Sequence, residues 1–391
     1  MLDTKLFREA DHRLVGHQPD DIVSAVKNCE LNKIYTDDFT NVTRVALAIA
    51  KSISKTFEND SRFRHLVFTP ILSGSMTEET KCFMPDEVDI VCRLENIVYD
   101  FDVDDHRVKC RAAHVVEFQH LCDSDADIVP SKLNRDFFNA VDIVIQEGRV
   151  YLPTNNEKFS ITMGTFALHF EDKISRLVVG YNSHYFNDLE ISIDLAPAGY
   201  RPDIPLPLNV ECHEHYALAK VSRFDDENIN FSVSYSLGEQ TLMASLPEHM
   251  RDGYILAKAI RLTAICEQPG LSREDLQDLE PIDIQKYISS YTLKNCLFII
   301  LKNIKKGQMG GIESCRFAWA DATYGELIDQ LETKRCIDVW YDESGTLLNC
   351  TNHDEDIYSC CQKRRLILAL CYQIRFWLTE NLTKLKCNEP L

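Results

Sequence analysis

The sequence predicts an α+β protein built from two lobes. Three observations support this prediction: strand-like patterns crowd the first half of the chain, helical periodicity dominates the second half, and a proline-rich turn separates the halves. The turn contains Pro202, Pro205 and Pro207, so we expect one domain over residues 1–205 and another over residues 206–391. A chain of 391 residues is long enough for each lobe to bury a sizeable core.

The first half begins with residues 1–37, which we expect to form a short helical lead-in. From Asp38 onward, apolar residues recur at helical spacing and predict a helix of about five turns. The other elements expected in this half are a helix at 134–146 and strands at 66–68, 87–94, 149–152, 159–162, 165–170, 177–181 and 189–195. Helices are expected in the second half at 250–263, 283–304, 324–333 and 359–378.

The composition is that of a globular protein. No run of 18 apolar residues exists, and the first residues lack an apolar signal core, so we expect no membrane partner and a cytoplasmic location. The fifteen cysteines are scattered and odd in number, which favours reduced thiols over disulfides. With 42 basic and 61 acidic residues the net charge is −19, which argues against broad, non-specific binding to nucleic acid but leaves room for a local basic groove.

The most informative segment runs from Ser73-Gly74-Ser75 to Glu87 and Asp89. Side chains alternate across a strand, so Glu87 and Asp89 are expected on one face and the apolar residues between and after them on the other. Two adjacent carboxylates repel unless a cation lies between them, and the Gly-Ser turn can offer backbone N–H groups and a hydroxyl to a triphosphate. This pattern predicts nucleotidyl transfer.

A third acid strengthens the prediction. Residues 189–195 alternate between apolar and polar side chains, and Asp194 emerges on the polar face. We therefore expect Glu87, Asp89 and Asp194 to hold two Mg²⁺ (or Mn²⁺) ions, with Asp194 helping to remove the proton of the attacking hydroxyl. The alternative is a pair of strands that end in solvated acids, and the Gly-Ser turn at a fixed distance favours the metal site.

These residues resemble the cyclic GMP–AMP synthase and male-abnormal-twenty-one (Mab) family of nucleotidyltransferases. The resemblance covers residues 38–380 in order and rests on the segments 72–75, 79–81, 85–91, 191–195, 256–258 and 289–294. It implies a bilobal nucleotidyltransferase fold, with a cleft between a twisted mixed β-sheet lobe and a helical C-terminal lobe of the Mab type.

The resemblance also implies a nucleotide-binding set. Ser75 would bind the triphosphate in a turn shaped by Ser73 and Gly74, and Lys258 and Lys294 would supply positive charge to phosphates. Ser290 would hydrogen-bond the donor nucleotide, Tyr291 would stack on a base, and Ser236 and Glu239 lie in a segment similar to the strand that contacts nucleotide. Read alone, Lys258 is a solvated helix lysine and Tyr291 a core aromatic.

The chain departs from the family pattern at two places. The vertebrate synthase pattern has Trp-Arg where this chain has Phe231-Ser232, which leaves open which bases are joined and by which linkage. The interval 241–254 contains no cysteine, so the zinc module of the DNA-sensing synthase is absent. The short clusters Cys212-His213-x-His215 and His353-(x)6-Cys360-Cys361 each lack four local ligands, and no structural zinc is expected.

The resemblance implies an enzyme that joins two NTPs, ATP and/or GTP, into a cyclic dinucleotide and acts as an innate immune receptor. Family members without the zinc module include receptors of double-stranded RNA. The basic residues that could contact its phosphates are Lys51, Lys55, Arg62 and Arg64, and a second group at Lys302, Lys305 and Lys306. Two other interpretations stay open: a catalytically silent Mab-type scaffold, and a template-free RNA nucleotidyltransferase.

Overall fold

The computed structural model describes residues 36–82, 85–102, 107–112, 115–151, 159–167, 173–182, 189–202, 214–219, 231–263, 288–333, 367–372, 374–376 and 378–379. These residues belong to two compact units, one from Tyr35 to Ala244 and another that contains the described residues from Ser245 onward. The helical lead-in expected at residues 1–37 lies outside the described residues apart from its last two, which open the first described helix.

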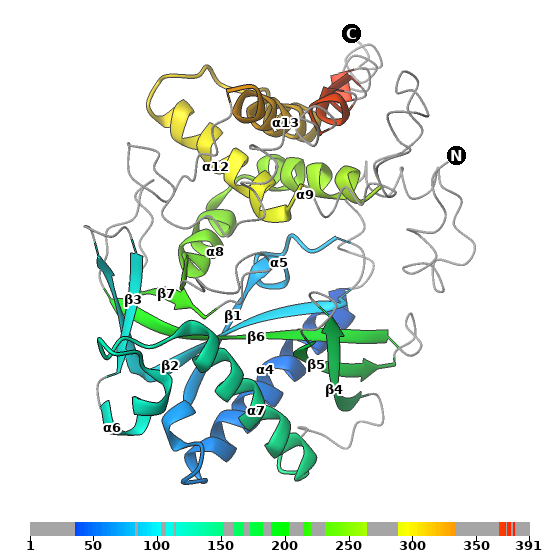
Figure 1. The fold of residues 1–391 in the computed structure, drawn as a ribbon. Helices are drawn as coiled ribbons and strands as arrows, with labels where there is room; N and C mark the ends of the chain where they lie inside the picture. The colour runs from blue at the N-terminus through cyan, green and yellow to red at the C-terminus, as the bar shows by residue number, and fades with distance from the viewer. Residues whose placement is uncertain are drawn as a thin grey trace, which may run out of the picture. The chain divides into compact units, whose positions relative to one another are not determined.

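The first unit contains a sheet and several helices (Figure 1). Its helices are α4 (Thr36–Glu58), α5 (Gly74–Thr77), α6 (Val115–Phe118), α7 (Pro130–Gln146) and α8 (Ser236–Ser245), with 3₁₀ turns η1 (Arg64–Leu66) and η2 (Gln119–Leu121). Its strands are β1 (Phe68–Ser73), β2 (Glu87–Asp102), β3 (Arg107–Ala112), β4 (Phe159–Ala167), β5 (Lys173–Tyr181), β6 (Leu189–Pro202), β7 (Glu214–Leu218) and β8 (Ser232–Ser234).

The strands form one mixed sheet in the order β1-β2-β6-β5-β4. The long strands β2 and β6 run parallel, and the other described neighbours are antiparallel. Three further pairings lie off this path. Strand β3 pairs with the C-terminal part of β2, β7 pairs with the C-terminal part of β6, and β8 pairs with β7. A mixed sheet combined with helices confirms the predicted α+β class.

Helices α4 and α7 cover one face of this sheet (Figure 1). Apolar side chains of α4 recur at helical spacing and are buried against the strands, which is the pattern that predicted this helix. An aromatic cluster joins the layers: the ring of Phe137 on α7 packs edge-on against Phe57 of α4 and Phe68 of β1, at centroid distances of 6.1 and 5.5 Å. The main core of the first unit therefore lies between the sheet and these two helices.

The opposite face carries a smaller apolar cluster of Val91, Ala198, Tyr216 and Leu218. Leu237 of α8 packs against this cluster, so α8 lies on the face opposite α4 and α7. Because side chains alternate along β2 and β6, this second face is also the one to which the polar residues of both strands point.

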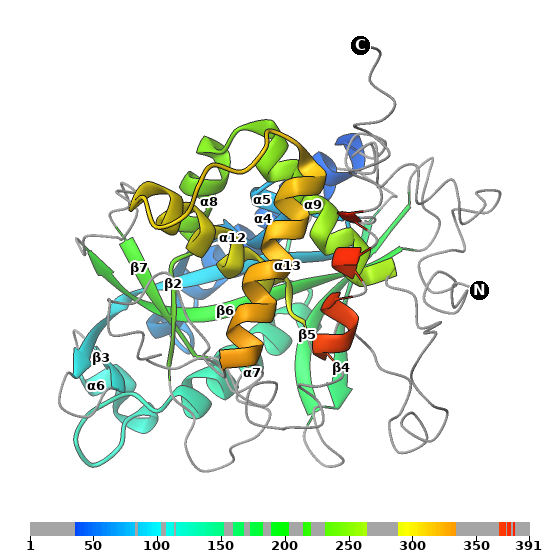
Figure 2. The same cartoon turned by 90° about the horizontal axis from the view of Figure 1, so that it is seen from above.

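The second unit is helical as far as it is described. Its helices are α9 (Glu248–Thr263), α12 (Ser290–Lys305) and α13 (Arg316–Thr333), followed by helical residues among 367–379. Figure 2 shows α13 packed beside α9 and α12. A Cβ added to Gly253 would lie only 2.4 Å from the Cβ of Trp319, so this glycine permits the close approach of α9 to α13.

Several boundaries differ from the sequence prediction. The strands expected at 159–162 and 165–170 are one strand, β4, because its pairing with β5 runs through Met163 and Gly164 without a break. The strand expected at 149–152 is absent from the described residues 149–151. Helix α13 begins eight residues earlier than expected, since Phe317 and Trp319 bury an additional apolar turn.

The division into domains at residue 205 also differs from the compact units. The first unit extends to Ala244, because β7 pairs with β6 beyond the proline-rich turn and α8 packs on the same sheet. Proline interrupts secondary structure. It does not decide whether the segment that follows pairs again with the same sheet.

Among the described residues, no helix combines the length and the apolar character needed to span a bilayer. The seven described cysteines are free thiols, and five of them are buried: Cys82, Cys92, Cys110, Cys296 and Cys371. Burial raises the pKa of the Cys92, Cys110 and Cys371 thiols, so these groups stay protonated and inert near neutral pH.

We predict that Phe137→Ala lowers the free energy of unfolding by about 3–5 kcal/mol, because it removes a fully buried ring at the junction of α4, α7 and β1. Urea denaturation followed by circular dichroism measures the loss. The matched control is Val116→Ala on α6, where the side chain is 85% exposed and a change within about 0.5 kcal/mol is expected. Equal effects of the two substitutions would contradict the described core.

Candidate active site

Three carboxylates converge on the polar face of the sheet. The parallel register pairs Asp89 on β2 with Asp194 on β6, and Glu87 lies two residues before Asp89 on the same face. One carboxylate oxygen from each of Glu87, Asp89 and Asp194 can be chosen so that all three lie within 4.8 Å of one another. The predicted convergence of the three acids is therefore confirmed.

The alternation that predicted their orientation is confirmed as well. Val88 and Ile90 belong to the main core, while Glu87 and Asp89 are accessible to solvent. On β6, Ile193 and Leu195 are buried in the same core and Asp194 is exposed. Each strand thus presents apolar residues to α4 and α7 and acids to the other face.

Lys81 is a cation beside these acids that sequence reasoning did not assign a role. Its Nζ lies 2.9 Å from Oδ1 of Asp86 and 3.4 Å from Oε2 of Glu87, and its side chain is only 12% exposed. Burial alone would lower the pKa of Lys81, but the charges of Asp86 and Glu87 outweigh it and the pKa is raised. The ammonium group is therefore charged near neutral pH and offsets part of the repulsion among the acids. The spacing of Lys81, Asp86 and Glu87 in the sequence does not predict this contact, because it depends on the path of the chain between α5 and β2.

Asp194 has a hydrogen-bond donor on its own strand. The hydroxyl of Ser192 donates to Oδ1 of Asp194 over 2.9 Å. This contact orients one oxygen of the carboxylate. The alternation of β6 places Ser192 on the same face as Asp194, so the sequence predicts that the two side chains are neighbours. It does not by itself predict the hydrogen bond between them.

Gly74 shapes the turn next to the acids. Strand β1 pairs Ser73 with Asp89, and the chain then turns into α5 at Gly74, which has a φ of +72°. A Cβ at this position would lie 2.0 Å from Oδ2 of Asp89, so only glycine allows both the backbone conformation and the close approach. Ser73 is buried and Ser75 is partly accessible. The structure therefore brings the Gly-Ser turn and the acids together.

Helix α8 places two further candidates on the same face. Ser236 and Glu239 are each 6% exposed, and the Ser236 hydroxyl finds no hydrogen-bond partner among the described residues. The side chain of Gln240 donates to the carbonyl oxygen of Leu72 over 2.8 Å, which attaches α8 to the end of β1. The sequence did not indicate this contact.

The remaining predicted residues lie in the second unit. Lys258 of α9 and Lys294 of α12 are buried, with their Nζ atoms 5.4 and 5.9 Å from the ring centroids of Tyr254 and Tyr291 respectively. The Tyr254 hydroxyl donates to the carbonyl oxygen of Ser290 over 3.0 Å and so connects the two helices. Tyr291 is 38% exposed and is therefore not the core aromatic of the alternative interpretation.

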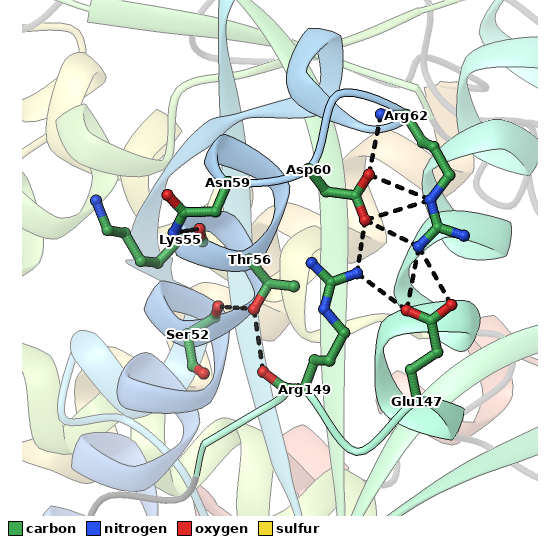
Figure 3. A network of polar contacts seen from close by, with 8 residues as sticks. All are labelled: Ser52, Lys55, Thr56, Asn59, Asp60, Arg62, Glu147 and Arg149. Atoms are coloured by element: carbon green, nitrogen blue, oxygen red, sulfur yellow. Dashed lines mark hydrogen bonds and ion pairs between the residues drawn. The ribbon is translucent and has the colours of Figure 1, made fainter.

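The basic residues considered for RNA have different surroundings, and Figure 3 shows Lys55 and Arg62 among them. Arg62 is paired with Asp60 and Glu147, at 2.8 and 3.1 Å, and Lys55 is paired with Glu58. Arg64 is exposed on η1. Lys51 and Lys55 line an open hollow of about 450 Å³ together with Ser52, Thr56, Asn59 and Arg149, among others.

No model of a known protein family matches the chain, and no significant match was found among curated proteins.

We predict that Gly74→Ala weakens Mn²⁺ binding at least tenfold, because a Cβ at this position displaces the Asp89 carboxylate. Calorimetric titration with Mn²⁺ measures the affinity. Gly148→Ala is the matched control, since Gly148 also has a positive φ, +66°, but a Cβ there meets nothing within 4 Å. Both variants carry a backbone cost of about 1–2 kcal/mol, and only Gly74→Ala should change metal affinity. Equal affinities in the two variants would contradict the described turn.

We predict that Asp60→Asn flattens the pH dependence of stability below about pH 4. Hydrogen bonds from Arg62 and Arg149 hold the pKa of Asp60 well below its usual value, and the same arginines lower the pKa of Glu147. A carboxyl whose folded pKa is depressed stabilises the fold above its unfolded pKa, and this stabilisation is lost as the pH falls through the folded pKa.

Melting temperatures of the wild type and Asp60→Asn between pH 2 and pH 7 test this prediction. The two curves should converge at the acid end and separate above about pH 4. The control is Glu58→Gln, which removes only the exposed pair with Lys55. Parallel curves for wild type and Asp60→Asn over the whole range would show that the ion pairs in Figure 3 do not contribute.

Proposed function

We propose that this protein is a nucleotidyltransferase that uses Mg²⁺ or Mn²⁺ to join two NTPs, ATP and/or GTP, into a cyclic dinucleotide second messenger. The observation that carries the proposal is the convergence of Glu87, Asp89 and Asp194 within 4.8 Å, beside a Gly-Ser turn that a side chain at Gly74 would obstruct. The resemblance to the synthase family points to the same chemistry.

The donor set fits the proposed ions. Carboxylate oxygens are the ligands that Mg²⁺ and Mn²⁺ prefer, and the site offers three such groups without imidazole or thiolate nearby in the described cluster. Bound there, a pair of divalent ions would offset the negative charge of the triphosphate and of the attacking oxygen. Lys81 already offsets part of the charge of Glu87, 3.4 Å from its Nζ atom.

The residues of the chain then have separate roles. Asp194 accepts the proton of a ribose hydroxyl, whose oxygen forms a bond to the α-phosphorus of a bound NTP while the bond to pyrophosphate breaks. Ser75 donates a hydrogen bond to the triphosphate, and the Ser236 hydroxyl, buried without a described partner, donates to the nucleotide. A second attack of the same kind within the linear dinucleotide closes the ring and releases a second pyrophosphate.

In this proposal four residues of the second unit also contact nucleotide. Lys258 and Lys294 provide positive charge to phosphates, Ser290 hydrogen-bonds the donor nucleotide, and Tyr291 stacks on a base. The exposed part of the Tyr291 ring and the position of Lys294 on the same turn of α12 support this assignment. Glu239, on the turn of α8 that also carries Ser236, contributes a carboxylate to nucleotide contacts.

We further propose an innate immune role in the cytoplasm with double-stranded RNA as the activator. Lys51, Lys55 and the exposed Arg64 are the residues that would contact phosphates, and the hollow beside Lys51 supports this choice. Arg62 contributes less, because two carboxylates already compensate its charge.

The test is an incubation of the purified full chain with labelled ATP and GTP, Mg²⁺ or Mn²⁺, and a panel of nucleic acids that includes duplex RNA. We expect a phosphatase-resistant product with the mass of a cyclic dinucleotide. The variant Glu87→Gln/Asp89→Asn should reduce its formation by about a thousandfold or more, because the charge that compensates the triphosphate is lost. The matched control is Glu95→Gln at a more distant position of β2, which should keep full activity.

Each other outcome overturns the proposal in a defined way. A ladder of longer products would identify a template-free RNA nucleotidyltransferase. If no product forms with any activator and the acid variant keeps the cellular output of the wild type, the chain acts as a scaffold. Equal losses in the acid variant and in Glu95→Gln would show that folding, not the site, determines the activity.

A further inference from the structure

A second group of ligand-type side chains lies in the first unit at the opposite end of β1 from the acids. His65 belongs to η1, directly before β1, whereas the acids lie beside Ser73 at the end of that strand. A strand of six residues is about 20 Å long, so the two groups are separate. We propose that His65, His120 and Asp136 form a binding site for a divalent transition-metal ion, with Zn²⁺ as its first candidate.

The geometry is close to that of a metal site. The Nε2 atom of His65 lies 2.8 Å from Oδ2 of Asp136, and the Nε2 atom of His120 lies 3.4 Å from the same oxygen. The three ligand atoms all lie within 4.8 Å of one another. In a tetrahedral zinc site with metal–ligand distances near 2.0–2.1 Å, neighbouring ligand atoms are about 3.3 Å apart. The two distances to Oδ2 of Asp136, 2.8 and 3.4 Å, lie on either side of that spacing.

Each ligand is held by a buried neighbour in the chain. Leu66, Leu121 and Phe137 follow His65, His120 and Asp136 directly, and each of these three residues is at most 2% exposed. The backbone at each ligand is thus anchored in the main core. The His65 ring also packs edge-on against the buried Phe118, at a centroid distance of 5.6 Å. A metal ion would find the three ligands largely preorganised.

The three side chains are accessible enough for a metal ion to enter from solvent and to leave again. The His65 side chain is 12% exposed, that of Asp136 is 32% exposed and that of His120 is 54% exposed. An ion can therefore enter from the His120 side, and water can occupy the fourth coordination position. Two imidazoles and one carboxylate suit Zn²⁺ and similar ions, whereas Mg²⁺ prefers oxygen ligands. This donor set distinguishes the site from the acids on β2 and β6.

A bound ion would connect three segments that are distant in sequence. Asp136 is 71 residues from His65 and 16 residues from His120, so no local cluster of histidines or cysteines reveals the site. This is why the sequence predicted no structural zinc. The ion would join η1, η2 and α7 and so stabilise the layer of helices against the sheet. Without metal, both imidazole Nε2 atoms lie within hydrogen-bond distance of Oδ2 of Asp136.

The test uses the full chain in buffer with excess Mg²⁺ and a calorimetric titration with Zn²⁺. The variants His120→Gln and Asp136→Asn each keep a polar side chain of similar size. The amide group that each substitution introduces is a poor zinc ligand. We expect each of them to bind one equivalent of Zn²⁺ less than the wild type, or to bind that equivalent at least tenfold more weakly. Saturating Zn²⁺ should raise the melting temperature of the wild type by about 3 °C or more, and that of the variants by less.

Two controls decide where the ion binds. His249→Gln on α9 changes a histidine outside the group, and Glu87→Gln/Asp89→Asn changes the acids. Both should keep the wild-type number of Zn²⁺ equivalents. If His120→Gln and Asp136→Asn bind Zn²⁺ as the wild type does, the three residues are only hydrogen-bonded partners and the proposal is wrong. It is also wrong if the equivalent disappears from the acid variant instead.

Discussion

The parallel pairing of β2 with β6 is the constraint on which the candidate active site depends. Its register aligns Asp89 with Asp194 and leaves Val88 and Ile193 in the main core. A slip of one residue would turn Asp194 into the core and bring Ile193 to the polar face, at the cost of burying a carboxylate. The apolar residues of the two strands therefore hold the acids together, although the acids themselves repel.

That repulsion is reduced by groups within the first unit. Lys81 brings a charged ammonium group to Asp86 and Glu87, and Ser192 donates a hydrogen bond to Asp194. Gly74 allows the turn after β1 to approach Asp89 closely. The three carboxylates are thus held together by groups of the protein itself. In the function proposed above, charge compensation and positioning would supply most of the catalysis.

The same unit illustrates two uses of ionisable side chains. On the polar face, acids gather where a ligand can add the missing positive charge. Around η1 and α7, Asp60, Arg62, Glu147 and Arg149 compensate one another and need no ligand (Figure 3). The group of His65, His120 and Asp136 combines both features. Its side chains are hydrogen-bonded to one another without a ligand, and its nitrogen and oxygen atoms are also suitable ligands for a metal ion.

Much of the fold and the acid site was predictable because the signals are local. Alternation over a few residues assigned Glu87, Asp89 and Asp194 to polar faces, and helical spacing located α4, α7 and α9. The boundary between the units was not predictable in this way. Proline marks the end of a strand, but the return of β7 to β6 depends on pairing between distant segments.

The sequence by itself determined which side chains face the core and which face solvent along each element, because the periods of strand and helix are built into the backbone. Only the tertiary structure decided which elements are neighbours. It placed Asp194 beside Asp89, Lys81 beside Glu87, and His65 and His120 around Asp136. Contacts of this kind depend on the crossover connections and on packing between layers, which no short window of sequence contains.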